Sequence, residues 1–231
     1  MKRVLLFGLA IALLIRGIWI PTLAQSEYGH VYCKNSANVR RIALTFDDGP
    51  HPRYTERILK ILEEYGVTAT FFVIGVNALA YPEDLQKIVD SGCEIGNHTY
   101  SHGKMGEKDE GEIEREILLC EELLTSVTGK RPTLFRPPEG CLTEDVKRAA
   151  KNLRYDVILW SVDTLDWAMN PVANIEKIIC EQVRGGDIIL MHDYVSGGNT
   201  TCQALRLMIP TLLARGYEFV TVSEMIQGDR K

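Results

Sequence analysis

The feature that most constrains the fold of this chain is a repeated alternation between short apolar segments and stretches with helical spacing. Between residues 42 and 222, segments of three to six largely apolar residues alternate with stretches whose apolar residues are three and four apart. Short apolar strands separated by helices indicate a parallel sheet that is covered on both faces. Seven segments are predicted strands: 42–46, 69–74, 93–96, 133–135, 156–160, 188–191 and 218–222.

The helical stretches are about six in number and have clear ends. The best patterns span 55–66, 83–92 and 112–129. A glycine follows the helical pattern at four places, as expected where a helix ends in a left-handed residue: Gly66, Gly92, Gly129 and Gly216. In a chain of 231 residues without a long linker, these units predict one α/β domain. Seven consecutive strand–helix units favour a barrel over an open sheet.

Residues 1–24 have the layout of a secretory signal peptide. A basic start precedes an apolar run over 4–15, and Ala24 stands at a cleavage position. The run is too short to span a bilayer, but Arg16 and the apolar residues after it leave an uncleaved membrane anchor as the alternative. We therefore expect an exported chain that acts outside the cell, in the cell wall or on the outer face of the plasma membrane. Residues 25–38 are predicted to be an irregular lead-in.

Charge and cysteine content narrow the function classes. The net charge is −5 and no basic patch with interleaved aromatics occurs, which argues against nucleic acid as a partner. Six cysteines in an exported chain allow three disulfides, but a domain of this size folds without them, and the cysteines can equally be small core residues. No Cys-x-x-Cys pair occurs, so a zinc–thiolate cluster is not expected.

Side chains with catalytic chemistry follow five of the predicted strands. In parallel α/β folds the functional site lies at the carboxyl ends of the strands. Carboxylates, imidazoles and an arginine would therefore gather on one rim, which indicates a catalytic site rather than a solvated surface. In chain order these residues are Asp47 and Asp48; Asn97, His98 and His102; Arg136 and the residues to Gly140; Asp163, Asp166 and Trp167; and His192 and Asp193.

The residue types on this rim suit metal-assisted hydrolysis. His98 and His102 are four residues apart, so a helical turn would project both imidazoles from one face. Two imidazoles and one carboxylate leave a coordination position open, the pattern of a catalytic zinc. One of the paired carboxylates, Asp47 or Asp48, would bind the cation and the other would take a proton from water. With His192 as the general acid, this set could hydrolyse an amide.

At these residues the sequence resembles the polysaccharide deacetylases of the NodB-homology type, carbohydrate esterase family four. The resemblance covers about residues 39–226 and consists of five motifs in the family's order: TFDDGP, His-x-x-x-His, RPPxG, DxxDW and LMHD. It implies an α/β fold of the distorted (β/α)7 barrel type. Residues 39–231 would form this single domain.

The resemblance also implies a role for each matching residue. Asp47 matches the catalytic base and His192 the acid that protonates the departing amine. Arg136 matches the arginine that holds the base, and Asp166 the carboxylate that orients the acid, with Asp163 as the weaker candidate for that role. The implied metal ligands are Asp48, His98 and His102.

The walls of the implied substrate cleft come from two motifs and one strand end. Trp167 and Leu190 match the apolar walls that receive the acetyl methyl group. Pro138, Glu139 and Gly140 match the loop whose backbone N–H contacts the oxyanion. Glu139 stands where many family members have an aromatic residue, so the substrate preference at this wall is left open.

The expected cofactor is a divalent metal, Zn²⁺ first, with Co²⁺, Mn²⁺ and Ni²⁺ as alternatives. The expected substrate is an N-acetylglucosamine polymer, and for an exported chain of this simple architecture peptidoglycan is preferred. Chitin oligomers, N-acetylmuramic acid and an exopolysaccharide remain as alternatives. From another class, the chain could be a non-catalytic carbohydrate-binding protein. We expect a monomer.

Three residues near the motifs receive other interpretations. His51 is predicted to be a supporting or surface residue rather than a metal ligand, and Trp160 is predicted to lie in the core at the end of its strand. Tyr194 follows the candidate acid and is interpreted either as part of the rim of the site or as ordinary surface.

Overall fold

The computed structural model describes residues 28–35, 40–195 and 200–227. The predicted signal peptide or anchor lies outside the described residues. No helix within the described ranges is both long enough and apolar enough to cross a membrane.

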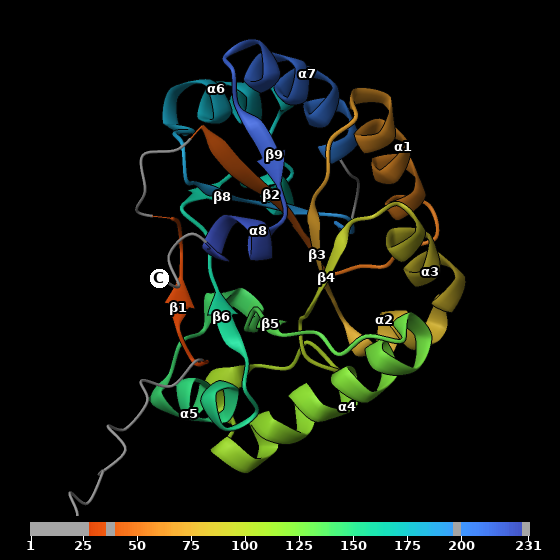
Figure 1. Ribbon diagram of the computed structural model, residues 1–231, viewed down its shortest axis with the longest axis vertical. Coiled ribbons are helices and arrows are strands. Elements are labelled where there is room, and N and C mark those ends of the chain that lie inside the picture. Colours follow the sequence, from red (N-terminus) through yellow and green to blue (C-terminus); the bar gives the residue numbers. More distant parts are fainter. Residues whose placement is uncertain (1–27, 36–39, 196–199, 228–231) are drawn as a thin grey trace, which may run out of the picture.

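The strands form one curved parallel sheet (Figure 1). Its order is β1-β6-β5-β4-β3-β2-β8-β7, and β9 also pairs with β2. The strands are β1 (Val31–Tyr32), β2 (Arg41–Asp47), β3 (Thr70–Val73), β4 (Glu94–Asn97), β5 (Leu134–Phe135), β6 (Asp156–Ile158), β7 (Val162–Asp163), β8 (Ile188–His192) and β9 (Glu218–Val220).

Most of the helices surround the outer face of this sheet, whereas the last helix packs against residues of its inner face (Figure 1). The α-helices are α1 (Thr55–Tyr65), α2 (Gly75–Ala80), α3 (Pro82–Asp90), α4 (Glu110–Thr128), α5 (Glu144–Asn152), α6 (Val172–Gln182), α7 (Thr201–Ala214) and α8 (Val222–Ile226). Three short 3₁₀ turns complete the described part: η1 (Met105–Glu107), η2 (Pro138–Gly140) and η3 (Asp166–Ala168). The two later turns lie at the rim where the candidate site residues were predicted.

The predicted fold class, an α/β distorted (β/α)7 barrel, is confirmed by the parallel strand order and by the ring of helices. The seven predicted strands correspond to β2–β6, β8 and β9, and β7 is an additional strand of two residues. The four glycines predicted at helix ends all have left-handed backbone, with φ of 62° at Gly66, 76° at Gly92, 70° at Gly129 and 78° at Gly216.

The prediction of an irregular segment before the domain is wrong at β1. Val31 and Tyr32 pair in parallel with Val157 and Ile158 of β6. Asn35, which is buried, donates a 2.6 Å hydrogen bond from Nδ2 to the carbonyl oxygen of Met225. A strand of two residues is too short to show a periodic pattern, and it forms because the edge of β6 offers unpaired backbone groups.

Side chains on the two faces of the sheet pack into different hydrophobic clusters, and this alternation also determines where Asp47 points. On β2, Ile42, Leu44 and Phe46 pack outward against the helices, whereas Ala43 belongs to a smaller cluster that also includes residues of α8. Because successive side chains of a strand point to opposite faces, Asp47 shares the inner face with Ala43. The last residue of β2 therefore directs its carboxylate into the barrel.

Candidate active site

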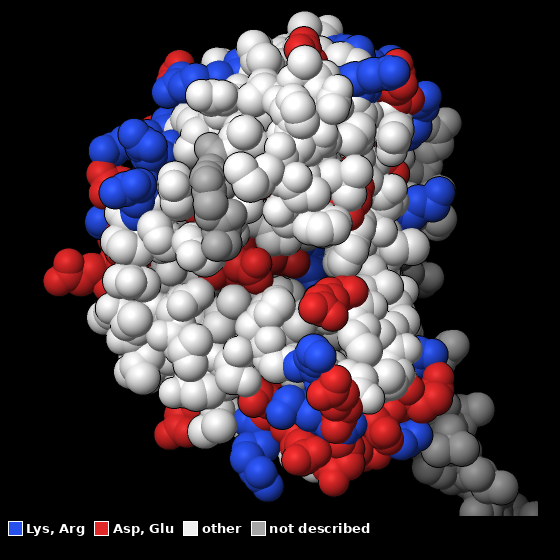
Figure 2. All heavy atoms as spheres, turned by 180° about the vertical axis from the view of Figure 1, so that it is seen from behind, with Lys and Arg blue, Asp and Glu red and all other residues white. Residues whose placement is uncertain are grey.

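The carboxyl ends of the strands surround a pocket of about 390 Å³. Figure 2 shows a hollow whose floor carries acidic atoms, with mostly uncharged surface around it. The pocket is lined by Asp47, Asp48, His98, His102, Glu139, Trp160, Asp163, Trp167, Leu190 and His192. Residues from five predicted strand ends thus meet at one place, as expected for a parallel α/β fold.

Asp47 is held by a buried arginine. The Arg136 guanidinium, fully buried, donates from Nη1 to Asp47 Oδ1 at 2.6 Å and to Thr45 Oγ1 at 2.9 Å. Its Nε and Nη2 donate to the carbonyl oxygens of Ile158 and Leu159, both at 3.1 Å. Every arm of the guanidinium is therefore engaged, and the orientation of Asp47 is set by a group that cannot rotate away.

Asp48, His98 and His102 form a compact cluster with metal-ligand chemistry. One ligand atom from each lies within 4.8 Å of the others. Asp48 Oδ1 is 3.5 Å from His98 Nε2 and 3.3 Å from His102 Nε2. This oxygen is buried, and no hydrogen bond within the described residues satisfies it. Burial by itself raises the pKa of Asp48, but the electrostatic influence of the nearby His98, His192 and His102 imidazoles lowers it overall.

The tautomer of His98 suits a cation at this cluster. Its Nδ1 lies 2.7 Å from the carbonyl oxygen of Arg136, which can only accept, so Nδ1 carries the proton and Nε2 presents a lone pair toward Asp48. A positive charge, either a proton on Nε2 or a metal cation, must then lie between Nε2 and the Asp48 carboxylate. The two imidazoles, the carboxylate and its unsatisfied oxygen therefore fit a divalent cation of the zinc type.

The predicted helical turn between the two histidines is wrong. Residues 98–102 form a loop, and Thr99 and His102 have left-handed backbone with φ of 67° and 55°. The Thr99 N–H donates to Asn97 Oδ1 at 2.9 Å, and the His102 N–H donates to Thr99 Oγ1 at 3.1 Å. These side-chain hydrogen bonds replace helical ones and bring the imidazole centroids to 5.0 Å.

His192 is oriented by Asp166, as its ring Nδ1 lies 2.8 Å from Asp166 Oδ1. The other carboxylate oxygen accepts hydrogen bonds from the His192 backbone N–H at 2.9 Å and from Thr201 Oγ1 at 2.7 Å. Burial alone would lower the pKa of His192, but the hydrogen bond and charge of Asp166, with the charges of Asp47 and Asp48, raise it to about 9.

Asp163, the weaker candidate for orienting the acid, does something else. Its Oδ1 accepts a 2.8 Å hydrogen bond from the Leu165 N–H, and its Oδ2 lies 3.5 Å from the Trp167 indole Nε1. Asp163 therefore supports the loop that carries Trp167. Of the two aspartates, Asp166 is the one that contacts His192.

The predicted substrate-wall residues divide into two groups. Glu139, Trp167 and Leu190 line the pocket, whereas Pro138, which is buried, and Gly140 are not among the lining residues. Trp167 is 53% exposed. The Gly140 N–H donates to the carbonyl oxygen of Pro137 at 3.0 Å.

Backbone strain is concentrated around the pocket. Six of the seven non-glycine residues with positive φ in the described chain belong to the loops at this rim: Asp48, Thr99, His102, Glu139, Leu165 and Met169. A non-glycine residue in this region costs free energy, so such strain persists only where the surrounding structure enforces it. Its location at one rim is what a functional site with fixed side-chain directions would need.

Sequence reasoning missed several residues that support the site. Trp160, predicted to lie in the core, lines the pocket, and the guanidinium of Arg136 lies 5.7 Å from its ring centroid. A Cβ on Gly140 would stand 2.8 Å from the Trp160 ring, which explains a glycine in this loop. Thr45 precedes Asp47 by two residues on the same face of β2, so strand alternation could have indicated it. The hydrogen bond from Thr201 to Asp166 could not be predicted, because the two residues are 35 positions apart and no local sequence pattern links them.

The comparisons with known proteins agree with this geometry. A family model of polysaccharide deacetylases matches residues 34–158. The fold and the site define a hydrolase of the carbohydrate deacetylase class. The chain belongs to the polysaccharide deacetylase family.

Three similar proteins indicate where in the family the chain stands. It is 37% identical over 201 residues to a peptidoglycan-N-acetylglucosamine deacetylase of Bacillus cereus, covering 86% of this chain and 94% of that protein. A crystal structure of a peptidoglycan N-acetylglucosamine deacetylase superimposes with a TM-score of 0.83 at 35% identity, covering 87% of this chain and 94% of that one. A pseudoenzyme of carbohydrate esterase family four from Bacillus anthracis superimposes with a TM-score of 0.80 at 28% identity, covering 86% and 69%. A protein with this fold can therefore lack activity, and the side chains in the pocket decide whether it is active.

Proposed function

We propose that this chain removes N-acetyl groups from N-acetylglucosamine residues of peptidoglycan outside the cell. The observation that carries the proposal is the convergence of three units on one pocket: the Asp47–Arg136 pair, the Asp48–His98–His102 cluster and the His192–Asp166 pair. The names of the relatives support peptidoglycan as the polymer. The convergence of all three units argues against a protein that only binds carbohydrate.

Asp48, His98 and His102 would hold a divalent cation, and we propose Zn²⁺, with Co²⁺, Mn²⁺ or Ni²⁺ as alternatives. When bound, such a cation supplies Lewis-acid chemistry: it polarises an amide carbonyl and lowers the pKa of water. His98 is held for this role by its hydrogen bond to the Arg136 carbonyl, which keeps the Nε2 lone pair directed at the cluster.

Asp47 is the proposed general base. Arg136 occupies its Oδ1 and leaves Oδ2 facing the metal cluster, 3.8 Å from His98 Nε2. Oδ2 would accept a proton from the attacking water as the oxygen of that water bonds to the acetamide carbon. The hydrogen bond from Arg136 fixes the orientation of the carboxylate and therefore of the Oδ2 lone pair that receives the proton.

The backbone N–H of Glu139 is the proposed donor to the oxyanion. Pro138 has no N–H, and the Gly140 N–H already donates to Pro137. Of the three residues in η2, this leaves the N–H of Glu139, whose φ of 57° turns the peptide away from helical geometry. A backbone donor of this kind stabilises negative charge whatever the Glu139 side chain is.

His192 is the proposed general acid. Its pKa of about 9 keeps it protonated at neutral pH, and Asp166 holds Nδ1, so Nε2 can deliver its proton to the amine nitrogen. The C–N bond then breaks, acetate is released, and the sugar residue remains in the polymer with a free amine. Trp167 and Leu190, which both line the pocket, would receive the methyl group of the acetamide.

The proposal also includes the sequence predictions on export, domain bounds and oligomeric state. Residues 1–24 would direct export and either be removed or tether the chain to the membrane, and residues 39–231 would form the deacetylase domain. We propose that the domain acts as a monomer on its polysaccharide substrate.

The test is acetate release by chelator-stripped protein reconstituted with zinc, on peptidoglycan and chitin oligomers in parallel. Metal-dependent acetate that is lost in Asp47→Asn supports the proposal, and the ratio between the polymers ranks the substrates. A folded, zinc-loaded protein that releases no acetate from either polymer would overturn it.

A further inference from the structure

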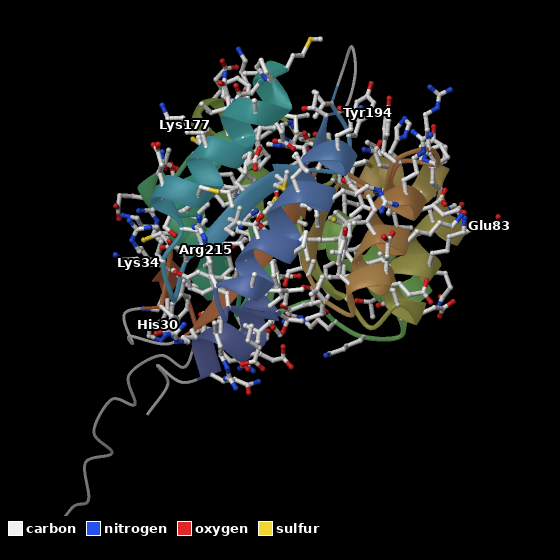
Figure 3. All side chains as sticks on the ribbon, turned by 90° about the horizontal axis from the view of Figure 1, so that it is seen from above. His30, Lys34, Glu83, Lys177, Tyr194 and Arg215 are labelled. Carbon is white, nitrogen blue, oxygen red and sulfur yellow. The ribbon has the colours of Figure 1, made fainter. Side chains whose placement is uncertain are left out.

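A cluster of aromatic rings lies beside the catalytic pocket and is separate from it. The rings are His51, Tyr54, Tyr81 and Tyr194, and we call these four residues the aromatic platform. None of them is among the residues that line the pocket. Tyr194 follows His192 by two residues and is 40% exposed. Figure 3, where Tyr194 is labelled, shows it at the edge of the molecule on the side of α1.

The His51 imidazole organises the platform by stacking against two tyrosines. Its centroid lies 4.8 Å from that of Tyr194, with an interplanar angle of 12°, and 4.9 Å from that of Tyr54, with an angle of 28°. Tyr81, which is 37% exposed, is tilted against His51 at 6.4 Å. The stack against His51 covers one face of Tyr194, and 40% of this residue stays exposed.

Hydrogen bonds fix this arrangement to the catalytic loops. The His51 N–H donates to Thr55 Oγ1 at 2.7 Å, and Thr55 Oγ1 donates to Asp193 Oδ2 at 2.5 Å. Asp193 immediately precedes Tyr194, so the contacts close into a circuit of four residues. Thr55 and Asp193 are both fully buried. The exposed face of Tyr194 is therefore held in place before any ligand arrives.

We propose that the aromatic platform binds a second sugar residue of the glycan whose N-acetyl group lies in the pocket. This inference rests on the proposed function and names a binding site outside the catalytic pocket. A preorganised, exposed tyrosine face packs against the apolar C–H face of a pyranose and loses little entropy on binding, while the sugar hydroxyls stay in water.

The position of Tyr194 selects this occupant. Two residues of extended chain span at most roughly 7 Å, so the backbone of Tyr194 borders on that of the proposed acid His192. A ligand on the platform would thus lie next to a ligand in the pocket, as neighbouring residues of one polysaccharide do. The contact surface consists of aromatic rings, which favour the apolar C–H face of a sugar over a charged peptide stem.

The test compares chain lengths with the metal-loaded, full-length protein. The ratio of kcat/KM for chitin hexamer to that for chitin dimer is measured in the parent, in Tyr194→Ala and in Tyr194→Phe. We expect the ratio to fall roughly threefold to tenfold in Tyr194→Ala, the usual effect of losing one stacking contact, and to be kept in Tyr194→Phe. Leu118→Ala is a matched control, because Leu118 is a similarly exposed apolar residue on α4.

Binding without turnover provides the second measurement. In an Asp47→Asn background, adding Tyr194→Ala should raise the Kd for chitin hexamer by the same factor, measured by calorimetry. An unchanged ratio and Kd would overturn the proposal. So would an equal fall on both lengths accompanied by a lower Tm, since Tyr194 would then be structural. A dependence on Tyr194 seen only with peptide-bearing fragments would also overturn it.

Failure of the proposed function would look different. In that case no oligomer would be deacetylated, whereas the hexamer Kd would still depend on Tyr194.

Discussion

The guanidinium of Arg136 donates a 2.6 Å hydrogen bond to Asp47 Oδ1, and neither side chain is more than 5% exposed. A buried ion pair of this kind balances the cost of desolvation only as long as both partners are present. The Arg136–Asp47 pair therefore contributes both to the chemistry of the pocket and to the stability of the barrel.

Replacement of Arg136 by Met should therefore damage both properties. The change leaves the Asp47 carboxylate buried without its partner, which costs about 3–5 kcal/mol. We expect a lower Tm in thermal unfolding and a fall in kcat/KM of at least about a hundredfold, since the proposed base also loses its orientation. Arg41→Met is the control. Arg41 is 50% exposed and pairs with the exposed Glu218, so its loss should cost less than about 1 kcal/mol. Equal effects of the two substitutions would contradict the prediction.

Asp166→Asn should move the basic limb of the pH–rate profile. A general acid must be protonated, so kcat/KM should stay high below the His192 pKa of about 9 and fall above it. Without the Asp166 charge, burial dominates and the limb should shift toward or below the ordinary value of 6.5. Asp163→Asn, which changes a carboxylate that does not contact His192, should leave the limb where it is. A limb that stays near 9 in Asp166→Asn would refute this role of Asp166.

The same pair makes stability depend on pH. Because folding raises the pKa of His192 from 6.5 to about 9, the protonated pair stabilises the fold fully below about pH 6.5. This contribution is lost as the pH rises through about 9. Chemical unfolding of the parent protein between pH 6 and pH 10 should show the decline. The decline in stability should be much smaller in Asp166→Asn. An identical decline in both proteins would contradict a stabilising role of the His192–Asp166 pair.

Removal of one proposed ligand should weaken metal binding more than it weakens the fold. Asp48→Ala removes the buried oxygen that lacks a hydrogen bond, so we expect zinc affinity, measured by chelator competition, to fall at least about a hundredfold. Added zinc should raise the Tm of the parent, because a ligand that binds only the folded state stabilises it, and should do so much less in the variant. Asp84→Ala is the control, since Asp84 lies on α3 and is not part of the cluster.

Gly49→Ala should destabilise the loop after Asp48. A Cβ at this position would stand 1.9 Å from Asp193 Oδ2, and Asp193 is fully buried and cannot move aside. Overpacking of this kind costs about 1–3 kcal/mol or more. Gly111→Ala provides the contrast. Gly111 lies in the first turn of α4, where the nearest atom would be 3.5 Å away, so this change should be neutral or stabilise slightly. Denaturant unfolding of both variants tests the prediction.

Much of the site was predictable from local patterns. The apolar segment 42–46 ends at Asp47, and strand alternation with the strand-end rule places that carboxylate at the rim of a parallel sheet. The same rule indicated His98, Arg136 and His192. The pair His98 and His102 was predicted to be adjacent on the basis of a helical turn, and the rings are adjacent because of a strained loop instead.

Local patterns could not assign partners across the barrel. Which of Asp163 and Asp166 faces His192, whether Trp160 lines the pocket, and whether β1 exists all depend on elements distant in the chain. The stack of His51 on Tyr194 belongs to the same group, since it joins the loop after β2 to the loop after β8.

The fold class, the strand ends and the kinds of side chain that they carry could be predicted from the sequence, because the periods of helices and strands and the signals at their ends are local. Which of those side chains meet depends on the three-dimensional fold. Arg136 and Asp47 are 89 positions apart, and their contact follows from the order of strands in the sheet. That order is set by packing of the whole barrel, and no periodic pattern within a single segment encodes it.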